Sequence, residues 1–211
     1  LAVIVSLITM SFSFASGVSV YAVKRLIDYR LAFGFLMISI PTALIASLLA
    51  PYLDERIILT LYALLVLGVA ANLYRSRPAG ETIPSGKSKW LMTSLGGFTT
   101  GAASVGIGEV VMPQLISRRI KSAVAAGTSV FVVFITVLAS SLALGFQLSQ
   151  SADVTIPWNV ICYTVPGVLI GSQIGPRLQG LIPKRPFELT IATLFVIIAA
   201  ATLLVVLMKL S

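Results

Sequence analysis

The sequence predicts an all-α integral membrane protein, a polytopic helical bundle of inverted repeats with a glycine-rich broken or re-entrant hairpin. Of its 211 residues, 57% are hydrophobic and 10% are charged, whereas an ordinary soluble domain carries about 25% charged residues. The apolar runs are about 20 residues long, the length that a helix needs to cross a bilayer. They do not alternate in the way that the strands of a membrane barrel do.

Seven apolar segments follow one another along the chain. Polar, charged or proline-containing loops separate them, and the longest polar stretch, 75–89, is typical of a linker. Trp90 and Trp158 stand at segment starts, as interfacial anchors do. The predicted segments are 2–22, 31–50, 57–74, 90–116, 124–145, 158–176 and 187–208.

The basic residues predict how these segments cross the membrane, since Lys and Arg gather in cytoplasmic loops. If the glycine-rich fourth segment enters and leaves on one face, 13 of the 15 basic residues lie on that face, and only Arg56 and Lys209 lie on the other. If it crosses fully, the split is 8 to 7. We therefore expect a re-entrant hairpin with cytoplasmic ends, and the net charge of +8 then reflects topology rather than nucleic-acid binding.

The chain also contains an internal repeat. The second and sixth segments align with an offset of 125 residues, so that Pro41 meets Pro166 and Ser47 meets Ser172. Both segments carry a small residue at every fourth position, which lets helix backbones approach closely in lipid. The small residues are Thr42, Ala46 and Ala50 in one copy and Gly167, Gly171 and Gly175 in the other. Between equivalent positions of the two copies, the chain crosses the membrane three times. The second copy therefore has the opposite orientation in the membrane, as the repeats of many secondary transporters do.

The repeat divides the chain into two copies and a linker. Residues 1–75 form the first repeat, 76–89 a cytoplasmic linker, and 90–211 the second repeat with its glycine-rich hairpin. The first and fifth segments align with an offset of 123, which places the start of the first copy before Leu1. We therefore expect an N-terminally truncated chain whose first copy has its own hairpin upstream.

The absence of histidine and the single Cys162 exclude several function classes. Ser-His catalysis and most zinc and haem sites need histidine, and one cysteine cannot form an intrachain disulfide. We expect no enzyme, no metal and no cofactor. A membrane enzyme using Glu109 with Ser104 is a distant alternative.

The glycine-rich stretch from Gly96 to Pro113 is the candidate binding site. Dense glycine disfavours a continuous helix, and broken backbone at membrane depth is buried in protein or lines a wet cavity. Unwound Gly106 and Gly108 would expose amide groups at the start of a half-helix near Gly108, and Ser104 would add a hydroxyl donor. These features suit a small anion. The alternative is that the glycines only permit close packing.

Glu109 is the one carboxylate of this stretch, and two roles for it stay open. Burial favours the neutral form of a carboxyl, which could donate a hydrogen bond or couple transport to protons. Alternatively, an ionised Glu109 caps the half-helix and is stabilised by its dipole. Pro113 is expected to fix the second half-helix of the hairpin.

Gly127, Thr128 and Ser129 form a second candidate cluster at the start of the fifth segment. A hydroxyl pair beside a glycine can donate to substrate oxygens. It can equally close a helix end or bond back to its own helix. Both interpretations stay open here. Arg118, Arg119 and Lys121 are expected mainly to anchor the topology, with attraction of anions as the alternative.

These motifs resemble the TauE/SafE family of sulfite and organosulfonate exporters. The resemblance rests on Ser-Val-Gly-Ile-Gly-Glu at 104–109, Pro113, and Ala-Gly-Thr-Ser at 126–129. It extends over the whole chain and implies export of sulfite or similar anions across the inner membrane. Glu109 departs from the family pattern, because a third glycine is expected there, and Pro113 follows the run more closely than usual.

The predicted function is therefore a secondary transporter in the cell membrane that exports small anions such as sulfite or organosulfonates, working by alternating access around a midplane site at the glycine-rich hairpin. The predicted substrate-binding residues are Ser104, Gly106, Gly108, Glu109, Pro113, Gly127, Thr128 and Ser129. The predicted partners are the anionic substrate and the lipid bilayer, without nucleic acid. The alternative function is a membrane scaffold or accessory subunit that transports nothing itself. Substrate identity, coupling ion and oligomeric state stay open.

Overall fold

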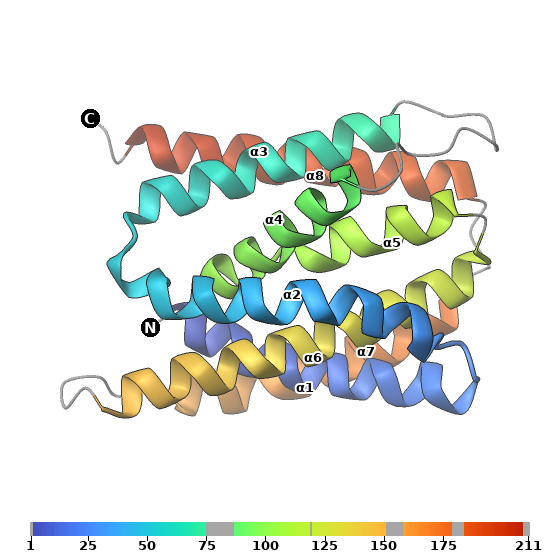
Figure 1. Ribbon diagram of the computed structural model, residues 1–211, viewed down its shortest axis with the longest axis horizontal. Coiled ribbons are helices and arrows are strands. Elements are labelled where there is room, and N and C mark those ends of the chain that lie inside the picture. Colours follow the sequence, from blue (N-terminus) through green and yellow to red (C-terminus); the bar gives the residue numbers. More distant parts are fainter. Residues whose placement is uncertain (1, 75–86, 119, 151–157, 179–183, 209–211) are drawn as a thin grey trace.

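The computed structural model describes residues 2–74, 87–118, 120–150, 158–178 and 184–208 (Figure 1). Within these ranges every regular element is a helix. The helices are α1 (Ala2–Val23), α2 (Tyr29–Leu49), the 3-10 helix η1 (Ala50–Tyr52), α3 (Glu55–Tyr74), α4 (Lys87–Ala103), α5 (Ile107–Ser117), α6 (Ser122–Ser149), α7 (Trp158–Leu178) and α8 (Lys184–Met208). Each predicted apolar segment is helical, and the glycine-rich fourth one is divided into α4 and α5.

The all-α membrane fold class is confirmed by the length and the apolar character of these helices. Among the described residues, α1, α2 and α6 are each long and apolar enough to cross a membrane. Large apolar side chains on several helices face outward, where lipid can cover them. They include Phe12, Phe33, Met37, Leu64, Leu142 and Ile197.

The helices form layers with α4 and α5 in the middle. On one side α3 packs along α8, and on the other α2 packs against α4 and α6, while α1 packs against α6 and α7. Figure 1 shows α4 and α5 between the α3–α8 pair and the remaining helices, with the chain reversing between them. The middle pair is therefore enclosed by helices on two sides.

The ends of the bundle separate the described basic residues. Figure 1 places the α1–α2 and α5–α6 connections at one end of the bundle and η1 at the other. The first end carries the exposed Lys24, Arg25, Arg118 and Lys121, and Arg56 lies just after η1. This arrangement agrees with the predicted charge distribution. Residues 76–86 of the predicted linker lie outside the described residues, as do Arg75, Arg119 and Lys209.

Helices α2 and α4 approach each other closely, and glycine makes this contact possible. A Cβ atom added at Gly97 would lie 2.9 Å from the Ser39 carbonyl oxygen, and one at Gly101 would lie 2.9 Å from the Ala43 carbonyl carbon. Ser47 also donates a hydrogen bond of 3.2 Å to the Gly101 carbonyl. The small residues of α2 that meet α4 are Ser39, Thr42, Ala43 and Ser47, and Thr42 belongs to the predicted stripe.

The corresponding glycines of α7 have no such neighbour. A Cβ at Gly167 or Gly171 would meet nothing within 4 Å. Pro166 is exposed beside them, as Pro41 is on α2. The two segments that align in sequence therefore have different surroundings in the described structure.

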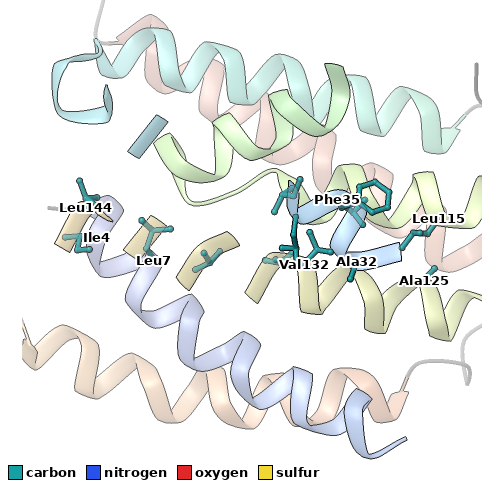
Figure 2. Close-up of a cluster of buried hydrophobic side chains, with 13 residues drawn as sticks. Ile4, Leu7, Ala32, Phe35, Leu115, Ala125, Val132 and Leu144 are labelled. Atoms are coloured by element: carbon teal, nitrogen blue, oxygen red, sulfur yellow. The ribbon is translucent and has the colours of Figure 1, made fainter. Parts of the chain in front are cut away.

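The apolar core joins α1, α2, α5 and α6. Phe35 and Ala32 of α2 lie beside Val132 of α6 and Leu115 of α5, and Ile4 lies near Leu144 (Figure 2). In a bilayer such contacts gain little from removal of water, because lipid tails are as apolar as the core. Their stabilisation comes from close van der Waals packing.

Candidate functional site

The backbone turns sharply between α4 and α5, and this turn is the centre of the candidate site. Helix α4 ends at Ala103 and α5 begins at Ile107. Ser104 has φ 65° and Gly106 has φ 140°, both in the region that favours glycine. A Cβ at Gly106 would overlap the Thr99 hydroxyl and lie 3.1 Å from the Thr99 Cβ. The turn therefore requires glycine at position 106 for both its conformation and its packing.

Thr100 connects the two helices across the turn. Its hydroxyl donates to the Gly96 carbonyl at 2.8 Å and accepts the Ile107 amide at 2.8 Å. The Ser104 amide bonds to the Thr100 carbonyl at 2.9 Å. Thr100 thus accepts a hydrogen bond from an amide in the first turn of α5, which has no acceptor within its own helix. Sequence reasoning did not assign it a role, although a hydroxyl residue one turn before a helix break is a usable signal.

Ser104 holds the turn against α1. Its side chain is 2% exposed, and its hydroxyl donates to the Val3 carbonyl at 3.1 Å. The hydroxyl proton is therefore used within the protein in this state. To donate to a substrate, Ser104 would have to release α1.

Glu109 occupies the position of the acidic residue in a capping box. It is the third residue of α5, and the backbone amides of Gly106 and of Glu109 itself lie near its carboxyl. In a capping box, a carboxyl at the third helical position reaches back to the amide of the capping residue. Tyr62 of α3 lies close enough to Glu109 to interact electrostatically with it. Of the two predicted roles, this position favours the cap.

Gly108, Ser129 and Pro113 shape the first turns of α5. The Ser129 hydroxyl of α6 donates to the Gly108 carbonyl at 3.3 Å, and a Cβ at Gly108 would lie 3.1 Å from a methyl group of Val133. Pro113 lies inside α5, the second half-helix of the hairpin. Because proline has no N–H, the Glu109 carbonyl cannot receive its usual helical hydrogen bond.

Gly127 and Thr128 lie away from the turn and support the α1–α2 connection. A Cβ at Gly127 would overlap the Leu26 carbonyl oxygen. The Thr128 hydroxyl accepts the Asp28 amide at 2.9 Å, and Asp28 in turn caps α2 through the Leu31 amide at 3.0 Å. Of the Gly127–Ser129 cluster, only Ser129 has a hydrogen bond to the residues of the hairpin.

The interior polar groups are neutral donors and acceptors. Every buried polar side chain in the described ranges is Ser, Thr or Gln. No group of three or more His, Cys, Asp or Glu side chains suited to a metal occurs among the described residues. A ligand at the turn would meet hydroxyls, backbone amides and the partly buried Glu109.

Comparison with known proteins places the chain in a family. The family model described as "Sulfite exporter TauE/SafE" matches residues 1–202. The chain belongs to the TauE/SafE family. Searches of curated proteins and of solved structures gave no match. TauE/SafE membership identifies a multi-pass membrane protein of a transporter family, and the glycine-rich turn lies within the matched residues.

Proposed function

We propose that this TauE/SafE protein exports small anions such as sulfite or organosulfonates, with the substrate bound at the turn between α4 and α5. The observation that carries the proposal is the interrupted helix pair enclosed within the bundle of a transporter-family protein. The N-terminus of a half-helix carries partial positive charge and free amide groups, which attract anions. Broken helices supply such groups in many secondary transporters.

The residues of the proposed site have different roles. Gly106 and Gly108 allow the backbone to approach the substrate, and Ser104 and Ser129 offer hydroxyl donors once their present acceptors are released. Pro113 leaves a carbonyl of α5 without its helical partner. Gly127 and Thr128 fix the α1–α2 connection behind Ser129 and act by positioning.

Glu109 is proposed to hold the first turn of α5 when no substrate is bound. Its carboxyl lies near the Gly106 and Glu109 amides, to which an anion at this helix end would also bind. Substrate and carboxyl therefore compete for the same donors. Protonation of Glu109 would free these amide donors for the anion, so anion transport could be coupled to proton binding at Glu109.

The proposed mechanism is alternating access in the cell membrane. Residues 1–75 and 90–211 act as inverted repeats joined by 76–89, and rocking of one against the other exposes the turn to each face in succession. The hairpin re-enters from the cytoplasmic side, where the exposed basic residues lie. The proposal needs no cofactor and no catalytic step.

The test is anion flux into liposomes that contain the purified protein. Sulfite and a small sulfonate are supplied on one side, and the variant Gly108→Ala is compared with Gly145→Ala. A Cβ at Gly108 would crowd Val133 at 3.1 Å, whereas one at Gly145 would lie 4.0 Å from Ile4. We expect flux in the wild type and in Gly145→Ala, and reduced flux in Gly108→Ala with an unchanged melting temperature.

The alternative of a scaffold without transport gives a different result. It predicts no flux of any anion in the wild type, measured beside an anion transporter that works under the same conditions. It also predicts that the glycine variants differ only in stability. Either outcome would refute binding at the turn as the function of this chain.

A further inference from the structure

The contact between α2 and α6 contains three hydroxyl groups that the proposed site does not use. Ser39 of α2 and Thr136 and Ser140 of α6 are all 0% exposed. The hydroxyl oxygens of Ser39 and Thr136 lie 2.9 Å apart, and either group can be the donor. Ser140 follows Thr136 by one helical turn and so lies on the same face of α6.

The hydrogen-bonding capacity of these hydroxyls is only partly used. The bond between Ser39 and Thr136 uses one hydroxyl proton, and within the described residues the other proton of the pair has no recorded acceptor. The Ser140 hydroxyl oxygen is buried and has no hydrogen-bond partner. Most buried polar groups are paired, so an unpaired one calls for an explanation. Neighbouring Ser141 shows the usual arrangement, because it donates to Val137 at 2.8 Å.

The three hydroxyls lie next to the hairpin. A Cβ at Gly97 of α4 would be 3.1 Å from the Ser39 Cα, so Ser39 directly adjoins α4. Along α6, the buried polar residues Ser129, Thr136 and Ser140 are spaced by seven and four residues, which keeps them on one face. Ser129 bonds to Gly108 beside the turn. The polar face of α6 therefore begins at the turn and continues away from it between α2 and α6.

We propose that Ser39, Thr136 and Ser140 line the substrate path beyond the turn and donate hydrogen bonds to the oxygens of a sulfite or sulfonate anion. This inference rests on the proposed transport function. Sulfite and sulfonate oxygens accept several hydrogen bonds, and uncharged hydroxyls bind them weakly enough to release them. The spare protons found here are the donors that such an anion requires once α2 and α6 separate.

The first experiment separates transport from stability with two adjacent serines. Ser140→Ala removes an unpaired buried hydroxyl, so we expect a higher melting temperature together with a roughly threefold to tenfold rise in KM for sulfite, the loss of one uncharged hydrogen bond. Ser141→Ala removes a paired hydroxyl, so we expect a lower melting temperature and unchanged KM. Equal KM values in Ser140→Ala and the wild type would overturn the proposal.

The second experiment detects the opening of the path directly. In a Cys162→Ser background, Ser140→Cys and the outward-facing Leu138→Cys are treated with an anionic methanethiosulfonate that does not cross membranes. We expect Ser140→Cys to be labelled while a small sulfonate is transported at low concentration and to be protected by an excess of that sulfonate, which, unlike sulfite, does not react with the reagent. We expect Leu138→Cys to stay unlabelled in lipid. A Ser140→Cys variant that transports the sulfonate but is never labelled refutes this inference alone. A wild type without any flux refutes the proposed function, and this inference with it.

Discussion

Replacing Gly101 by alanine tests the backbone contact between α2 and α4. A Cβ at this position would overlap the Ala43 carbonyl oxygen and lie 2.9 Å from its carbonyl carbon and 3.0 Å from its Cα. These are backbone atoms, so no side-chain rotation can relieve the overlap. Ordinary contact begins at 3.4 Å, so α2 and α4 must separate by at least half an ångström.

The expected cost combines three effects. Overpacking costs about 1–3 kcal/mol, and a backbone obstacle belongs at the upper end. Loss of the 3.2 Å bond from Ser47 to the Gly101 carbonyl adds about 0.6 kcal/mol, a typical value between membrane helices. Alanine recovers up to about 1 kcal/mol through its higher helix propensity. We therefore expect Gly101→Ala to destabilise the protein by about 2–3 kcal/mol.

Gly167→Ala is the matched control, because its Cβ would meet nothing within 4 Å. We expect it to be as stable as the wild type or more stable by up to about 1 kcal/mol. The assay is thermal unfolding in detergent, where 1 kcal/mol corresponds to about 2–4 °C for a chain of this size. Equal melting temperatures for Gly101→Ala and Gly167→Ala would refute backbone contact between α2 and α4.

Three further predictions concern the turn. Gly106→Ala should lower the melting temperature by several degrees, because a Cβ there overlaps Thr99 and the φ of 140° is strained for alanine; an unchanged thermal melt would contradict this. Thr100→Val removes the acceptor of the Ile107 amide and should cost about 0.5–2 kcal/mol, measured by the same melt, and a neutral effect would show that α5 needs no such cap. Glu109→Gln removes the competing charge and should tighten sulfite binding measured by titration calorimetry, whereas weaker binding would indicate that Glu109 contacts the substrate.

The helical fold was predictable because apolar length and charge placement are properties of local sequence. The predicted segments of about 20 apolar residues are helices, and the density of glycine predicted a helix break close to Gly106, where α4 ends and α5 begins. The same patterns could not show which glycines lie against a neighbouring backbone. Gly101 and Gly167 are both glycines in apolar helices, but only the first meets a neighbouring backbone. That distinction depends on which helix lies opposite, which is a tertiary property.

The candidate site was predictable in place but not in detail. Sequence patterns located the turn and Ser129 beside it. They could not show that Thr128 turns to the α1–α2 connection, because adjacent residues on a helix point about 100° apart and the facing element is unknown. They also left Glu109 undecided, since its role depends on the amides that its side chain reaches.

The hydrogen bonds of the turn constrain any mechanism that places an anion there. The Ile107 amide is bonded to the Thr100 hydroxyl, and the Gly106 and Glu109 amides lie near the Glu109 carboxyl. In this state the donors at the start of α5 are thus largely satisfied by the protein's own oxygens. An anion would gain from this helix end by replacing one of those oxygens. In the proposed mechanism the Glu109 carboxyl is the group that leaves, and Glu109 would then control access to the proposed site.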